Sequence, residues 1–192
     1  LSLKQVSTQL RAADDLGTLQ VLAGQIRRLA GNLMGQGVQA RQITELISHL
    51  NDALTDRLFG LLVPRFELEG IDWCWMSVGS EGRREQTVAT DQDNAILFEC
   101  AAGEADLVRP RLLLFARAAN DALAELGFPL CTGDIMARNP EYCLTGREWR
   151  EQHQRVAVLD AREAPRVSAG GDRDVGQGCR LAGDRVELVD GK

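Results

Sequence analysis

WCWMSVGSEGRREQTVATDQDNAILF, residues 73–98, contains two short apolar runs on either side of a polar segment. The first run, residues 73–78, is rich in aromatic and apolar side chains and ends at Gly79. The second run, residues 95–98, has the same character. Short apolar runs bounded by glycine or polar residues are typical of buried strands. We therefore expect two neighbouring strands joined by a polar connection.

The polar connection carries two groups suited to binding phosphate and metal. Gly79 lets the backbone approach a ligand closely, and Ser80 can cap a helical turn whose free N–H groups bind an anion. Asp91 and Asp93 open the second strand, where residues two apart point to the same side. Two adjacent carboxylates repel each other, and a shared divalent cation such as Mg²⁺ relieves the repulsion. This combination indicates phosphoryl or nucleotidyl transfer.

The spacing of these residues resembles a known signature. Gly79-Ser80 followed by Asp91-x-Asp93 is similar to the motif of the polymerase-β-type nucleotidyltransferase superfamily. The longer string GSEGRREQTVATDQDNAILF, followed by GFPLCTGDIMARNPEY at residues 127–142, is closer to one family within it. It resembles the nucleotidyltransferase domain that lies beside CBS and cyclic-nucleotide-binding domains in bacterial signalling proteins, a relative of the PII-protein uridylyltransferases. The resemblance covers roughly residues 16–149.

The resemblance implies roles for individual residues. Asp91 and Asp93 are expected to be catalytic and to bind Mg²⁺ or Mn²⁺. Gly79, Ser80 and Arg83 are expected to bind the phosphates of a nucleoside triphosphate (NTP). Guanidinium groups suit bidentate contact with phosphate, which favours Arg83 for this role.

Asp134 has two interpretations. Superfamily members often use a third carboxylate from a later strand to activate the acceptor, and Asp134 lies in the strand that we expect over residues 129–136. The alternative is that Asp134 is a turn or capping residue, because it follows Thr132-Gly133. The residue pattern leaves both interpretations open.

The resemblance implies a metal-dependent, uridylyltransferase-like enzyme that transfers a nucleotidyl group from NTP to an acceptor hydroxyl, with a signalling protein as a candidate acceptor. The alternative is a catalytically inactive module that senses nucleotide or mediates interactions within a larger regulatory protein, because a fold does not determine its function. A third interpretation is that the two aspartates simply cap a strand.

Composition narrows the class of protein. The net charge of −6 over 192 residues argues against a non-specific nucleic-acid binder. Five cysteines without a CxxC motif and only two histidines argue against a zinc site, and we interpret Cys74, Cys100 and Cys131 as small buried residues. Absence of a signal peptide or a long apolar run predicts a cytoplasmic protein without a membrane span. Because the chain begins with Leu, we expect a fragment whose full-length protein carries upstream CBS or cyclic-nucleotide-binding domains.

The chain divides into three expected parts. Residues 1–70 form an N-terminal helical segment with a hairpin of two amphipathic helices, over residues 16–34 and 40–66. Residues 71–150 form the nucleotidyltransferase core, with a helix near residues 106–126. Residues 151–192 are glycine-rich, irregular and flexible or truncated. The expected fold is α/β (α+β), a nucleotidyltransferase-type mixed sheet with helices packed on it, preceded by the hairpin.

Overall fold

The computed structural model describes residues 3–77 and 91–153. Three helices come first, α1 (Leu3–Ala12), α2 (Leu16–Gly35) and α3 (Ala40–Leu62), followed by the 3₁₀ turn η1 (Val63–Arg65). The core then contains β1 (Asp72–Ser77), β2 (Asn94–Glu99), α5 (Ala105–Glu125), η2 (Pro140–Tyr142), β3 (Cys143–Thr145) and α6 (Gly146–His153). The arrangement confirms the predicted mixed α/β fold. The expected tail beyond residue 153 lies outside the described residues.

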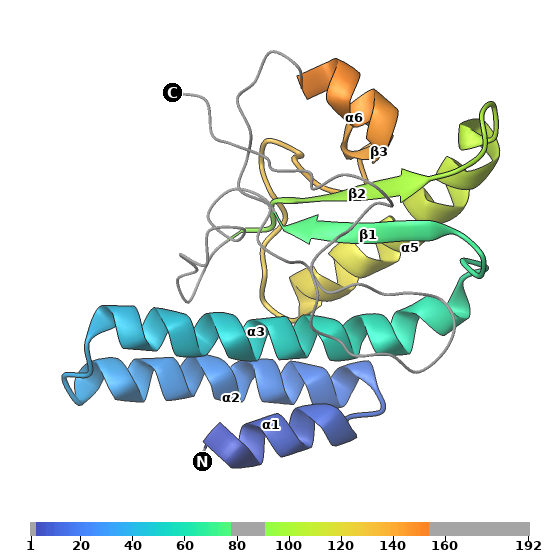
Figure 1. Cartoon of the computed structure of the whole chain (residues 1–192). Helices are drawn as coiled ribbons and strands as arrows, with labels where there is room; N and C mark the ends of the chain where they lie inside the picture. The colour runs from blue at the N-terminus through green and yellow to red at the C-terminus, as the bar shows by residue number, and fades with distance from the viewer. Residues whose placement is uncertain (1–2, 78–90, 154–192) are drawn as a thin grey trace.

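The sheet has the strand order β1-β2-β3 (Figure 1). The strands β1 and β2 are antiparallel, and β3 is parallel to β2. Side chains alternate between two hydrophobic clusters, because successive residues of a strand point to opposite faces. Trp75 and Ile96 belong to the cluster shared with α3 and α5, whereas Met76 and Leu97 belong to the cluster that contains Trp149 of α6. Helices therefore cover both faces of the sheet.

The predicted helical hairpin is present, and α1 packs against both of its helices. The start of α2 is capped by Asp15, whose carboxylate accepts hydrogen bonds from the backbone N–H and the hydroxyl of Thr18 at 2.8 and 2.7 Å. Such a cap satisfies N–H groups that the first helical turn leaves free. The helix α3 ends at Leu62, before Pro64 and short of the expected residue 66, since proline disrupts a helix interior.

An aromatic cluster joins the hairpin to the core. Phe115 of α5 lies between Phe59 of α3 and Trp73 of β1, with ring centroids 5.5 and 5.0 Å apart, respectively. Trp75 of β1 also meets Phe59 edge to face, at 4.9 Å. Aromatic pairs prefer such tilted contacts, which add to the stabilisation from buried area. The cluster fixes α5 between α3 and the sheet.

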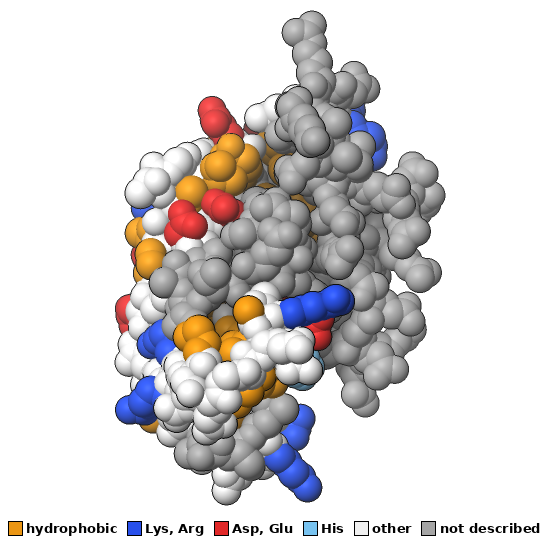
Figure 2. All heavy atoms as spheres, turned by 90° about the vertical axis from the view of Figure 1, so that its left-hand side faces the viewer, with side chains coloured by type: hydrophobic (Ala, Val, Ile, Leu, Met, Phe, Trp, Pro, Cys, Tyr) orange, Lys and Arg blue, Asp and Glu red, His pale blue; other side chains and the backbone are white. Residues whose placement is uncertain are grey.

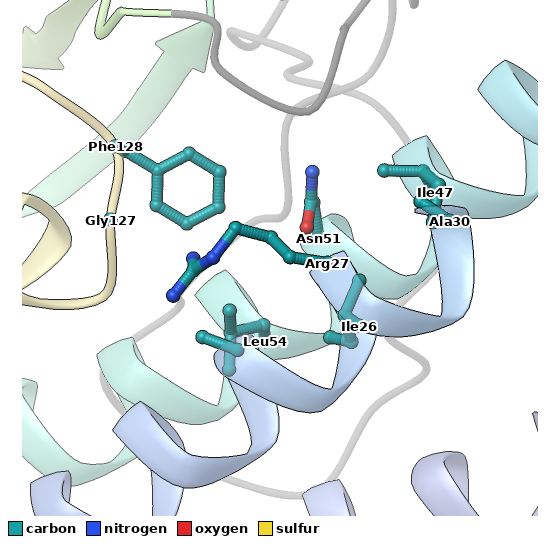
Figure 3. A pocket seen from close by; sticks show the side chains of 9 residues that line it. Ile26, Arg27, Ala30, Ile47, Asn51, Leu54, Gly127 and Phe128 are labelled. Carbon is teal, nitrogen blue, oxygen red and sulfur yellow. The ribbon is translucent and has the colours of Figure 1, made fainter. Parts of the chain in front are cut away.

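The hairpin also holds the chain where α5 ends. Arg27 of α2 donates a hydrogen bond from Nη1 to the backbone carbonyl of Leu126 at 2.6 Å. Figure 3 shows the Arg27 side chain extending from α2 towards the segment that carries Gly127 and Phe128. Gly127 has φ of +96°, a conformation that glycine adopts at the ends of helices. The contact ties the first residues after α5 to the hairpin.

We predict that Gly127→Ala destabilises the protein more than Gly103→Ala. Both glycines have positive φ, so both substitutions carry a backbone cost of about 1 kcal/mol. A methyl group at Gly127 would lie 2.9 Å from Cζ of Arg27, whereas nothing lies within 4 Å at Gly103. Displacing the guanidinium from the Leu126 carbonyl adds a further cost of roughly 1–2 kcal/mol. Urea unfolding of the two variants measures the difference, and equal destabilisation would contradict the proposed contact.

We also predict that Asp56→Asn stabilises the protein at neutral pH. Burial, with a smaller contribution from the charge of Asp52, raises the pKa of Asp56 on α3 to about 6. The folded state therefore binds this proton more tightly than the unfolded chain, and stability falls as pH rises from about 4 to 6. Because Asp56 is partly exposed, the gain for Asp56→Asn above pH 6 is on the order of 1 kcal/mol.

Thermal unfolding of this variant and the wild type near pH 7.5 and pH 4 tests the ionisation effect. The stabilisation should be present at the higher pH and nearly vanish at the lower one. Equal stabilisation at both pH values would attribute the effect to packing instead of charge.

Candidate functional site

The residues just before and at the start of β2 alternate between the core and the surface. Gln92 and Asn94 are each 1% exposed, whereas Asp91 is exposed and Asp93 is half-buried. Ligand atoms of Asp91, Asp93 and the thiol of Cys131 all lie within 4.8 Å of one another. The carboxylates thus lie together, as the two-residue period predicts, but β2 begins at Asn94, so both aspartates precede the strand that they were expected to open.

The segment after α5 holds this end of β2 in place. The backbone N–H of Gln92 donates to the carbonyl of Pro129 at 2.8 Å, and that of Asn94 donates to the carbonyl of Ile135 at 3.0 Å. Between these two contacts, the N–H of Asp134 donates to the carbonyl of Cys131 at 3.1 Å and closes a turn. Backbone pairing and the turn together bring Cys131 beside the two aspartates.

The prediction of a strand over residues 129–136 is wrong. The sheet's third strand is β3, and residues 129–136 contain a turn instead. Asp134 has φ of +54°, a left-handed conformation that interrupts an extended strand. Aspartate is among the few non-glycine residues that tolerate this region. This geometry agrees with the interpretation of Asp134 as a turn residue and leaves its exposed carboxylate available for chemistry.

Asp134 lies near the carboxylate pair without joining the group defined above. Burial raises the pKa of Tyr142, and nearby negative groups, among them Asp134 and Asp93, raise it further. Arg138 is directed elsewhere, since its guanidinium forms an ion pair with Asp121 of α5 at 3.1 Å.

Cys131 and Cys100 are only partly buried, which corrects their interpretation as small buried residues. Burial raises the pKa of the Cys131 thiol, and a hydrogen bond with Asp93 raises it as well. The thiol is therefore protonated at neutral pH and acts as a hydrogen-bond donor towards Asp93. Metal ions bind the thiolate, so the two carboxylates are the stronger donors in this group and favour a hard cation.

Sequence reasoning missed Asn120, which is 0% exposed and lies on α5 directly behind Gln92 and Asn94. The signal was an asparagine within the apolar stripe of the expected helix, between Ala119 and Leu123. A polar residue at a core position needs hydrogen-bond partners, but helical spacing does not say which ones.

The expected nucleotide-binding residues Gly79, Ser80 and Arg83 lie outside the described residues, and their role stays a prediction. The start of β2 lies at the left end of the sheet in Figure 1, and Figure 2 views the molecule from that side. On this face, some acidic side chains lie beside hydrophobic ones.

Comparison with known families gives a match over most of the chain. The model of the family described as "Putative nucleotidyltransferase DUF294" matches residues 24–163. No curated protein is significantly similar to the chain. Among the described residues, no helix is both long enough and apolar enough to cross a membrane.

We predict that Asp93→Asn accelerates alkylation of Cys131. Removing the carboxylate removes two influences that raise the pKa of the thiol, so the thiolate fraction near pH 8 should increase and the rate should rise roughly threefold or more. Peptide-resolved iodoacetamide labelling in the presence of chelator measures the rate. Cys100 is an internal control, since burial and other carboxylates raise its pKa. An unchanged Cys131 rate would contradict its contact with Asp93.

Proposed function

The chain belongs to this nucleotidyltransferase family, and from that premise we propose that it transfers a nucleotidyl group from an NTP to an acceptor hydroxyl beside the start of β2. The observation that carries the proposal is the pair Asp91 and Asp93, whose ligand atoms lie within 4.8 Å of each other and of the Cys131 thiol. Paired carboxylates next to an anionic substrate suit chemistry that depends on charge neutralisation and positioning.

The donor set fits Mg²⁺ or Mn²⁺. Asp91 and Asp93 would hold the ion through carboxylate oxygens, which hard cations prefer, while the protonated thiol of Cys131 orients Asp93. The ion would neutralise phosphate charge and polarise the phosphoryl group under attack. Zinc would instead favour a deprotonated thiol, which the raised pKa of Cys131 opposes.

The remaining roles follow from the sequence and from the position of Asp134. Gly79, Ser80 and Arg83 would bind the β- and γ-phosphates of the NTP. The acceptor oxygen would attack the α-phosphorus, the bond to the β-phosphate would break, and pyrophosphate would leave. Asp134 would accept the proton of the acceptor hydroxyl, since its carboxylate is exposed.

A specific observation favours the second candidate function, a nucleotide-sensing module without catalysis. Asp134 has the backbone conformation of a turn residue, which gives it a structural role independent of any acceptor. In either case we propose that the chain acts within a larger cytoplasmic regulatory protein with CBS or cyclic-nucleotide-binding domains, and that the acceptor, if there is one, is a signalling protein. Turnover separates the two functions.

We predict that Asp93→Asn weakens Mg²⁺-dependent NTP binding by at least tenfold, because it removes one of two charged donors. Calorimetric titration of each NTP, with and without Mg²⁺, measures the affinity. Asp72→Asn is the matched control, since it makes the same charge change at an exposed position at the opposite end of β1. An equal loss of NTP affinity in both variants would contradict a role of the carboxylate pair in binding.

The same proteins, incubated with α-³²P-labelled NTPs and extract proteins, test catalysis. Label transfer with pyrophosphate release supports the transferase, and Asp134→Asn should then reduce transfer while leaving NTP affinity within roughly twofold. Metal-dependent binding without label transfer would support the sensing module instead.

A further inference from the structure

We infer that Asn120 of α5 is a positioning residue for the carboxylate pair. The inference rests on the proposed function, and it assigns a role to a side chain that touches neither carboxylate directly. Asn120 is completely buried. It lies where three parts of the core meet: the helix α5, the start of β2 and the loop after α5.

The Asn120 side chain forms hydrogen bonds both with residues at the start of β2 and with the loop after α5. Its Nδ2 donates to Oε1 of Gln92 at 2.7 Å and to Oδ1 of Asn94 at 2.9 Å. Its Oδ1 accepts a hydrogen bond from the backbone N–H of Arg138 at 3.1 Å. Both amide hydrogens and one oxygen lone pair are therefore engaged. One side chain thus contacts both the residues that alternate with the aspartates and the loop that carries Asp134.

The two amides at the start of β2 complete the network. Nε2 of Gln92 donates to the backbone carbonyls of Asn120 and Phe128 at 2.9 and 2.8 Å. Oδ1 of Asn94 also accepts from the backbone N–H of Ala137 at 2.8 Å. The resulting amide cluster, defined as Gln92, Asn94 and Asn120, links α5 to both ends of the loop.

The amide cluster orients the carboxylates because successive side chains of an extended chain point to opposite sides. Gln92 lies between Asp91 and Asp93, so fixing Gln92 and Asn94 in the core fixes the direction in which the carboxylates project. A shift of this segment by one residue would exchange the positions of the amides and the carboxylates and bring both carboxylates into the core. Buried amides without partners are costly, so the network opposes such a shift and specifies a single register.

Apolar packing alone does not explain why a polar residue lies at position 120. Its neighbours on the same face of α5, Ala116, Ala119 and Leu123, are apolar and buried. An apolar residue at position 120 would fill the core without any hydrogen-bond requirement, but it would not specify which part of the loop lies beside which strand residue. The amides provide that specificity at the point where Asp91 and Asp93 leave the core.

Mn²⁺ binding to the whole chain tests the inference. Asn120→Leu keeps the number and branching of side-chain heavy atoms and removes every side-chain hydrogen bond, and we expect its Mn²⁺ affinity to fall by roughly 10- to 100-fold, as when partners of ligating residues are lost. Asn120→Ser retains a hydroxyl and should lose less. Leu50→Ala is the matched control, because it destabilises a completely buried position in the hairpin and should leave the affinity within roughly twofold.

Amide hydrogen exchange without metal provides a second measurement. In Asn120→Ser, the N–H groups of Gln92 and Asn94 should exchange at least about tenfold faster than in the wild type, while those of α2 stay unchanged. This measurement remains decisive if Asn120→Leu fails to fold.

The outcomes separate this inference from the proposed function. A wild type that binds Mn²⁺ and Asn120 variants that bind it equally well would overturn the role of Asn120 alone. Unchanged exchange at Gln92 and Asn94 would do the same. A wild type that binds no Mn²⁺ would overturn the proposed function and this inference with it.

Discussion

The site depends on one constraint, the alternation of amides and carboxylates over residues 91–94. A strand can bury every second side chain only if its register is fixed, and the register here is fixed by hydrogen bonds that bury two amides against α5. The opposite side then receives Asp91 and Asp93, whose mutual repulsion a packed core could not accommodate. Burial of neutral polar groups on one side thus makes a close pair of acidic groups possible on the other.

The helix α5 connects the amide cluster to the rest of the core. Phe115 packs in the aromatic cluster with α3 and β1, and Asn120 lies one and a half turns further along in the amide cluster. Where α5 ends, Arg27 of the hairpin holds the Leu126 carbonyl, two residues before Phe128, whose carbonyl accepts from Gln92. The hairpin is therefore connected to the carboxylate pair through a short chain of direct contacts. A displacement of α2 relative to α5 would first move the loop that follows α5.

Periodicity predicted those parts of the molecule whose structure depends on local pattern. The hairpin, β1, β2 and α5 follow from apolar spacing, and the shared side of Asp91 and Asp93 follows from the two-residue period. The segment 129–136 was predicted wrongly, because its apolar residues suit a strand while the left-handed conformation of Asp134 depends on the turn closed with Cys131. Asn120 was missed because spacing reports that a position is buried but not which distant groups it meets there. The same holds for Cys131, which approaches Asp93 only through tertiary structure.

The turn at Asp134 and a chemical role for its carboxylate are compatible. The turn fixes the backbone through the carbonyl of Cys131, and the side chain of Asn139 donates to the carbonyl of Asp134 at 3.1 Å. Both contacts involve the main chain, so the carboxylate remains exposed. Burial raises the pKa of Tyr142 most, and the charges of Asp134 and Asp93 add to the shift. The proposed role of Asp134 as a base for an acceptor hydroxyl requires a firmly held side chain that is not itself a metal ligand, and a backbone-anchored turn residue meets that requirement.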